Sequence, residues 1–274
     1  ISGNDITWGS IVIINSNVCS RFNIVKVNNN TVAVSYKNND DNTINMCAAT
    51  INGTTISWGT TISATEGMVL SYYFNDLLYV GNNTVVMCWY AYYNGQVGRM
   101  IAATISGNTI TASDTSYSAG VCMTTPRLAT IGSGFVMVGT NNFAYDVINS
   151  VYCTISGTVI TVNATTTAGY GAIGCYDIIQ TSTNSVMYLV GTASNFYIAM
   201  GILSGTSVSF EDQALAYTGN GWGDLEYIED GIVILTYTES QESNICKTKR
   251  IHYSGTSIID EGVSPVSIGT ISSS

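Results

Sequence analysis

Charged side chains are scarce in this sequence: they make up 9% of its 274 residues, whereas globular chains typically carry about 25%. Eight basic residues stand against 18 acidic ones, which gives a net charge of −10. Affinity for a nucleic-acid backbone needs clustered Lys and Arg, so we expect no nucleic-acid partner. The one dense basic stretch, residues 247–250, falls in a predicted strand, where its charges are expected to face solvent.

Long apolar runs are absent as well. No run approaches the ~18 residues that a membrane-spanning helix requires, so we expect no membrane insertion. The first residues, Ile1, Ser2 and Gly3, lack the positively charged region with which a signal peptide begins. We therefore expect a chain without a signal peptide that folds in a cytosol.

The usual signs of disulfides, metals and cofactors are missing too. The seven cysteines are odd in number, form no Cys-x-x-Cys pair and do not follow the repeat described below. This pattern favours reduced, mostly buried thiols over a disulfide framework. His252 is the only histidine, no second soft ligand stands at ligand spacing, and there is no glycine-rich phosphate loop. We expect neither a metal nor a cofactor.

What the sequence does contain is a recurring turn, made of an apolar residue, Ser or Asn, and Gly. Its glycines are spaced 50, 54, 50, 48 and 50 residues apart, at Gly3, Gly53, Gly107, Gly157, Gly205 and Gly255. Glycine accepts positive φ freely, so such a turn between alternating strands indicates a hairpin. Six turns at nearly constant spacing bound five copies of one unit.

Each unit is predicted to contain four antiparallel strands, a to d. Strand a starts with a polar residue and is expected at residues 23–27, 76–80, 127–131, 177–181 and 224–228. Strand b is almost wholly apolar, which is typical of a strand buried on both faces, and is expected at residues 32–36, 85–90, 135–138, 186–190 and 232–237. Strand c is more mixed, as at residues 44–51 and 148–155. Strand d, as at residues 55–59 and 158–162, precedes a connection rich in Ser, Thr, Ala and Gly.

Four-stranded units with the most apolar strand inside are typical of β-propeller blades. We predict one all-β domain over residues 1–274, a five-bladed β-propeller of four-stranded antiparallel blades with strand a innermost. The rival architecture is a β-solenoid, whose coils are usually shorter. Residues 5–9 and 257–261 are both candidate d strands, and one chain end is expected to complete the blade that begins at Asp224.

Two of the units carry a family resemblance. The segments at residues 48–59 and 102–111 resemble a repeat seen in phage tail-fibre proteins and other virion-associated or bacterial surface proteins. The resemblance covers the whole chain at the level of the repeat, but the motif contains no catalytic residue. It implies a receptor-binding or structural module of an extracellular or virion-associated assembly, with the prospect of assembly into a larger fibre.

A polar residue opens every strand a: Asn23, Asp76, Arg127, Asp177 and Asp224. In a propeller these positions meet at the mouth of the central channel, where carboxylates and a guanidinium could hold a cation, waters or sugar hydroxyls. The alternative is structural: each side chain bonds backbone N–H groups of the connection beside it. Recurrence at one repeat position favours this alternative.

Aromatic residues gather in the connections before strand a. Loop aromatics beside polar groups suit stacking on sugar rings, whereas packing between blades is the structural alternative. The predicted ligand-binding set combines them with the polar position: Tyr72, Tyr73, Asp76, Arg127, Tyr170, Asp177, Trp222 and Asp224.

These features favour a non-enzymatic binding module whose ligand is a glycan or a cell-surface receptor, as in a phage tail fibre or an adhesin. One rival is a glycoside hydrolase, in which Asp76, Asp177 and Asp224 would supply the carboxylates that the mechanism requires. No loop Glu is placed as a distinctive proton donor. The second rival is a structural spacer of a virion or appendage.

Overall fold

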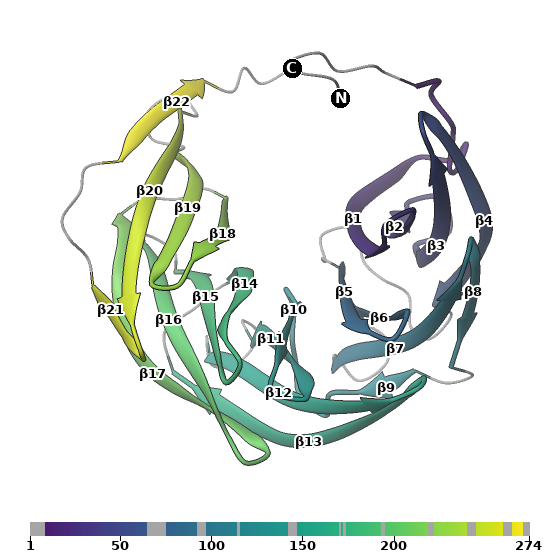
Figure 1. Ribbon diagram of the computed structural model, residues 1–274. Helices are drawn as coiled ribbons and strands as arrows, with labels where there is room; N and C mark the ends of the chain where they lie inside the picture. Colours follow the sequence, from purple (N-terminus) through teal and green to yellow (C-terminus); the bar gives the residue numbers. More distant parts are fainter. Residues whose placement is uncertain are drawn as a thin grey trace. The chain divides into compact units, whose positions relative to one another are not determined.

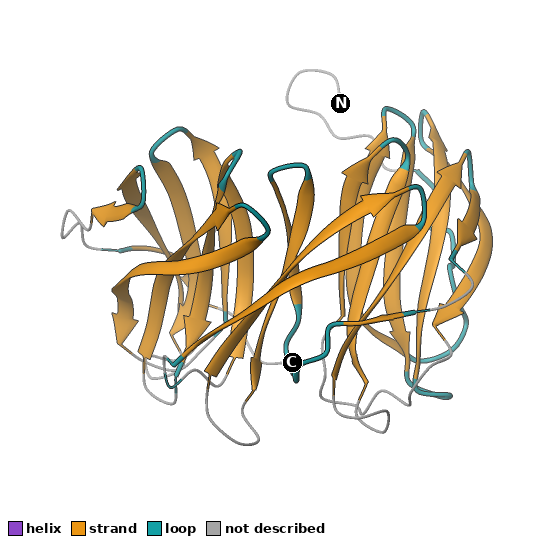
Figure 2. Cartoon of the chain, turned by 90° about the horizontal axis from the view of Figure 1, so that it is seen from below, coloured by secondary structure: helices purple, strands orange, loops and turns teal. Residues whose placement is uncertain are grey.

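The computed structural model describes most of the chain. The described residues are 9–64, 75–91, 97–113, 116–141, 147–169, 171, 174–192, 195–218, 222–239, 245–259 and 265–270. Within them the protein is all-β, built from repeated antiparallel sheets (Figure 2). No helix in this part of the chain has the length and apolarity needed to cross a membrane.

The chain divides into two compact units. The first comprises Ile1–Ser118 with Ile155–Ile160, and the second comprises Ala119–Thr154 with Thr161–Ser274. The sheets follow one another along the sequence, and each is made of consecutive strands (Figure 1).

In the part of the first unit that the structure describes there are two sheets. The strands of the first sheet, in order, are β1 (Cys19–Asn28), β2 (Thr31–Asn38), β3 (Thr43–Asn52) and β4 (Thr55–Ala64). Those of the second are β5 (Asn75–Gly81), β6 (Thr84–Ala91), β7 (Val97–Ser106) and β8 (Thr109–Ala112), with β9 (Tyr117–Ser118) also paired to β7.

In its described residues the second unit contains three sheets. Residues 155–160 of the first of these sheets are assigned to the other unit. That sheet consists of β10 (Arg127–Ile131), β11 (Gly134–Asn141), β12 (Val147–Ser156) and β13 (Val159–Ala168). The next consists of β14 (Gly174–Ser182), β15 (Ser185–Gly191), β16 (Asn195–Ser204) and β17 (Ser207–Thr218). The last consists of β18 (Gly223–Glu229), β19 (Ile232–Glu239), β20 (Ile245–Ser254) and β21 (Ser257–Ile259), with β22 (Val266–Thr270) also paired to β20.

The predicted strands a, b and c are confirmed in all five sheets. Each sheet has the order a-b-c-d, and β10 begins and ends at the predicted residues, 127 and 131. The recurring turns are confirmed at the five described glycines, where φ lies between 58° and 60°: Gly53, Gly107, Gly157, Gly205 and Gly255. The described residues thus form five sheets of this order, while their number as propeller blades and the closure of a propeller stay predictions.

The predicted strand d is too short. β4 runs to Ala64 and β13 to Ala168, so the Ser- and Thr-rich segments after residues 59 and 162 continue the strand instead of forming a connection. These strands pair on one side only, and a half-exposed edge strand carries little apolar alternation for a sequence pattern to reveal.

Strand d of the last sheet comes from the C-terminal part of the chain. Both β21 and β22 pair with β20, β22 near the start of that strand and β21 near its end (Figure 1). The prediction that a chain end completes the sheet begun at Asp224 is therefore met by β21 and β22. The other candidate strand, residues 5–9, lies outside the described residues except for Gly9.

The core lies between neighbouring sheets and is centred on the b strands. Every described side chain of β6 and β15 is buried. In the first unit Trp89 and Met87 are fully buried in a cluster that draws on both sheets. In the second unit Leu189 and Tyr237 belong to a cluster that joins the last two sheets. Apolar burial on both faces of strand b therefore holds neighbouring sheets of the same unit together.

The seven cysteines are thiols in the structure. Burial raises the pKa of Cys47 and of Cys153 to about 12, and only the thiolate reacts. In the folded protein at pH 8 both cysteines should therefore stay unmodified by iodoacetamide. A pKa raised from 9.0 to about 12 lowers the thiolate fraction roughly a thousandfold relative to an ordinary thiol. Peptide mapping checks this. The half-buried cysteines, Cys19, Cys122 and Cys246, should react before these two. Unfolding should expose all seven thiols, and rapid labelling of Cys47 in the folded protein would contradict the prediction.

Candidate functional site

Polar residues that open a strand a form hydrogen bonds with backbone groups, either of their own strand or of strand a in the next sheet. In the first unit the Asn23 amide donates to the carbonyl oxygen of Asn75 at 2.9 Å, which links β1 to β5. The Asn75 amide in turn donates to the hydroxyl of Ser35 at 2.8 Å. Asp76 accepts from the N–H of the next residue, Leu77, at 2.8 Å. All these bonds satisfy backbone or buried groups.

The second unit repeats this arrangement with charged side chains. Arg127 Nε donates to the carbonyl oxygen of Tyr176 at 2.7 Å, linking β10 to β14. Asp177 Oδ2 accepts from the N–H of Leu225 at 2.7 Å, linking β14 to β18. Arg127 and Asp177 therefore use some of their hydrogen bonds to join neighbouring sheets. This is a structural role, close to the backbone-bonding alternative given in the sequence analysis.

Asp177 and Asp224 form a carboxyl pair where β14 adjoins β18. Burial raises the pKa of Asp177 to about 8, with further contributions from its hydrogen bond to the Asp224 carboxyl and from the charge of Asp224. The N–H groups of Leu225 and Ile178 act in the opposite direction. Two carboxyl groups in hydrogen-bond contact share a proton, because both cannot ionise at that separation.

This contact bears on the hydrolase alternative. Retaining glycosidases separate their two carboxyl groups by roughly 5 Å and inverting enzymes by about 6.5–9.5 Å, to leave room for the sugar and water. A hydrogen-bonded pair leaves no such room. The third candidate carboxylate, Asp76, belongs to the other unit.

Trp222 lies beside a hollow of about 220 Å³ at the start of β18, which we call the Trp222 hollow. Its lining comes from the start of β18, the end of β19 and the start of β20, and consists of Trp222, Gly223, Asp224, Thr236, Tyr237, Thr238 and Cys246. The Trp222 side chain is 55% exposed. Two of the predicted ligand-binding residues, Trp222 and Asp224, are thus brought together.

The exposed indole is held by its surroundings. Its ring meets the half-buried ring of Tyr176 edge-on, with centroids 5.6 Å apart. The backbone N–H of Trp222 donates to the Thr238 hydroxyl at 3.0 Å, and its carbonyl oxygen accepts from the Thr238 N–H at 2.9 Å. An exposed aromatic ring with a fixed backbone and a half-buried aromatic neighbour is pre-organised to receive a flat apolar partner.

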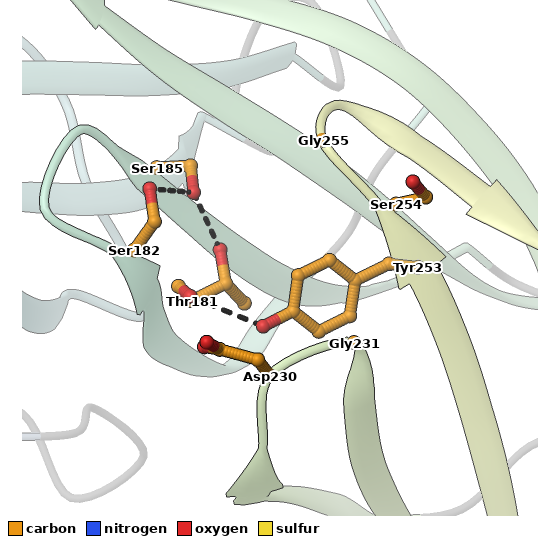
Figure 3. A pocket seen from close by; sticks show the side chains of 8 residues that line it. All are labelled: Thr181, Ser182, Ser185, Asp230, Gly231, Tyr253, Ser254 and Gly255. Carbon is orange, nitrogen blue, oxygen red and sulfur yellow. Dashed lines mark hydrogen bonds between the residues drawn. The ribbon is translucent and has the colours of Figure 1, made fainter.

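A larger cavity of about 480 Å³ lies at the opposite end of the same sheet, and we call it the hairpin pocket. Three turns line it (Figure 3): the β14–β15 hairpin, the β18–β19 turn and the β20–β21 turn, through Thr181, Ser182, Ser185, Asp230, Gly231, Tyr253, Ser254 and Gly255. The Tyr253 hydroxyl donates to the carbonyl oxygen of Thr181 at 3.1 Å. Asp230 accepts a hydrogen bond of 2.8 Å from Tyr227 and raises the pKa of that phenol to about 12.

The rest of the predicted ligand-binding set is divided. Tyr72, Tyr73 and Tyr170 lie outside the described residues. Arg127 bonds Tyr176, and Asp76 bonds its own strand. In the described part of the chain no cluster of three or more His, Cys, Asp or Glu is grouped to hold a metal ion.

Sequence reasoning missed the hairpin pocket. One signal was present: the apolar residue of the recurring turn is Ile or Leu in the first five copies, and Tyr253 stands there in the last. A tyrosine at a packing position brings a hydroxyl that needs a partner. The sequence did not indicate that Thr236 and Thr238 line the Trp222 hollow, because both lie in or next to the mostly apolar segment predicted as strand b.

Comparisons with known proteins bear on the fold. No protein-family model and no curated protein matches the sequence. A solved variant of AofleA from Arthrobotrys oligospora, with three arginines replaced by alanine, is similar in structure, with a TM-score of 0.52 and 8% identity over 89% of this chain and 73% of that one. AofleA from the same organism gives a TM-score of 0.41 at 11% identity, over 93% of this chain and 91% of that one. The likeness to the variant supports an all-β fold of repeated sheets.

Proposed function

We propose that this protein is a non-enzymatic carbohydrate-binding module and that the Trp222 hollow is its binding site. The observation that carries the proposal is the exposed indole of Trp222 beside a hollow that also contains Asp224 and two threonines. A sugar ring offers an apolar face to an aromatic ring and hydroxyls to the polar groups around it. The hollow is small, so it suits one sugar unit of a longer glycan.

The energetics agree with this role. An indole that is more than half exposed adds little to the core, whereas covering it with a sugar face removes apolar surface from water. Asp224 supplies acceptor oxygens and Thr236 a hydroxyl, which can replace the water that the sugar hydroxyls lose. The protein's net charge of −10 favours neutral or cationic glycans over acidic ones.

Two other roles are weaker. The contact between Asp177 and Asp224 disfavours a two-carboxylate hydrolase at this place. A structural spacer gives no reason for a tryptophan held in an exposed position. A phage tail fibre or adhesin, outside the cell or on a virion, remains a proposed setting that rests on the repeat resemblance alone.

Replacing Trp222 with alanine should lower glycan affinity roughly tenfold or more, because a central aromatic contact is typically worth over 1 kcal/mol. The melting temperature should change by less than about 3 °C, since the ring is largely exposed. A glycan array read for wild type and variant, combined with mass spectrometry of the incubated glycans, separates binding from cleavage.

Phe22 is a matched control. It is 56% exposed and stacks on buried Tyr36 with ring centroids 6.0 Å apart, so Phe22→Ala removes a similar exposed ring in the other unit. This variant should keep full glycan binding. Equal loss in both variants, or cleaved glycans in the mass spectra, would count against the proposed function.

A further inference from the structure

The hairpin pocket lies where the sheet β14–β17 adjoins the sheet β18–β21. The preceding junction in this unit, between β10–β13 and β14–β17, is packed differently. Where β10–β13 adjoins β14–β17, the N–H of Gly132 donates to the carbonyl oxygen of Thr183 at 2.5 Å. There the Leu203 side chain packs so closely that its Cδ2 lies 2.5 Å from the position a Cβ of Gly132 would take. An apolar side chain therefore fills that junction.

Polar residues stand at the matching positions of the next junction. Tyr253 replaces Leu203 in the recurring turn, and the closing pair of the hairpin is Ser182 with Ser185, whereas the preceding hairpin closes with Ile131 and Gly134. The Tyr253 side chain reaches the backbone of Thr181. It therefore links the two sheets and leaves the space between their turns unfilled. The result is the cavity of about 480 Å³, within the usual size range of small-ligand sites.

The lining has the chemistry of a polyol site. The hydroxyls of Thr181, Ser185 and Ser182 form a chain with oxygen–oxygen distances of 2.8 and 2.6 Å (Figure 3). Exposed Asp230 uses one carboxylate oxygen to accept from Tyr227, and it is the only charged residue of the lining. Hydroxyl groups that both donate and accept, beside one carboxylate, match a sugar ring that carries hydroxyls or an amine.

We propose that the hairpin pocket is a second saccharide site, which takes a pyranose unit whose hydroxyl or ammonium groups donate to Asp230. This second-site proposal rests on the proposed function only in taking a saccharide as the ligand. β18 separates the two sites, since Trp222 precedes its first residue and Asp230 follows its last. Seven residues of strand span roughly 23 Å, so one glycan chain or two glycans could engage both sites of this unit.

Ligand-observed NMR with methyl glycosides of the common hexoses and with the matching hexosamines tests the proposal. In the Trp222→Ala protein, which lacks the first site, at least one of these sugars should still show saturation transfer. Adding Ser182→Leu, which fills the pocket, should abolish that signal. Adding Ser204→Leu instead should leave it unchanged, because Ser204 is the exposed turn residue of the preceding repeat.

Asp230→Asn distinguishes the two ligand types and guards against a folding defect, because Asn keeps an acceptor for Tyr227. Hexosamine affinity should fall about tenfold or more with the charge removed, whereas neutral hexoses should lose less than about threefold. No saturation transfer from any sugar with Trp222→Ala, or transfer that persists with Ser182→Leu, overturns the second site. The Ser182→Leu variant that keeps Trp222 is read on the glycan array as well. Binding that persists there supports the Trp222 hollow as a site, whatever the result for the hairpin pocket.

Discussion

Asp177→Asn is expected to stabilise the protein at pH 8 and to leave it nearly unchanged at pH 4. The introduced side-chain amide can donate an N–H to the Asp224 carboxylate and accept the N–H of Leu225 with its carbonyl oxygen. The variant therefore keeps both contacts of the present Asp177 side chain without needing a proton. We expect a gain of about 2 kcal/mol at pH 8, or roughly 4–8 °C in melting temperature for a chain of this length.

The sign follows from the raised pKa. In the unfolded chain an aspartate loses its proton near pH 4, while burial and Asp224 hold the proton on Asp177 up to about pH 8 in the folded protein. Between these values the folded state binds more protons than the unfolded state, so stability falls as the pH rises. Below pH 4 both states are protonated and this loss is absent. Full burial would make the effect larger than about 2 kcal/mol, but Asp177 is only partly buried.

Thermal unfolding from pH 4 to pH 9 measures this difference. Wild type should lose stability across the range, and Asp177→Asn should lose less. Asp76→Asn, at the same repeat position in the other unit, removes a carboxylate that bonds the N–H of Leu77 and should not reproduce the gain. If Asp177→Asn lowers stability equally at pH 4 and pH 8, the carboxyl pair does not carry the shared proton inferred here.

Much of the fold follows from local patterns. Strand b is identified by continuous apolar residues, and all of β6 is in fact buried. The recurring glycines are identified by spacing, and Gly53 and Gly107 adopt the left-handed conformation that the turn requires. These features depend on neighbours in sequence, so the sequence is enough to predict them.

Features that depend on two sheets could not be predicted in this way. The repeat position of Arg127 and Asp177 was recognised, but its partners, Tyr176 and Leu225, lie about 50 residues away on the next first strand. The ring of the exposed Trp222 meets Tyr176 of the preceding sheet edge-on. A single sequence gives the identity of a side chain and its local period, but not which neighbour fills the space beside it.

Two of the three Trp-Gly pairs in the sequence are a signal whose meaning appears only in the structure. Trp8-Gly9 and Trp58-Gly59 occur 50 residues apart, and each glycine lies against the turn of the following sheet. A Cβ added to Gly59 would overlap the carbonyl oxygen of Asn108, and one added to Gly9 would overlap that of Thr54. The Asn108 amide also donates to the carbonyl oxygen of Trp58 at 3.4 Å. Glycine is needed here for close approach of two backbones.

Gly59→Ala should therefore destabilise the protein by about 3 kcal/mol or more, because the atom it would overlap belongs to backbone and cannot rotate away. Gly53→Ala is the matched control six residues earlier. Its φ of 59° disfavours alanine, but nothing lies within 4 Å of the added Cβ, so it should cost only about 1–2 kcal/mol. Urea unfolding of both variants compares the two. A larger loss for Gly59→Ala means that the contact between sheets limits stability more than the conformation of a turn does. Equal losses would mean that β4 and the β7–β8 turn can separate at little cost, and the apolar core between the b strands would then hold these sheets together by itself.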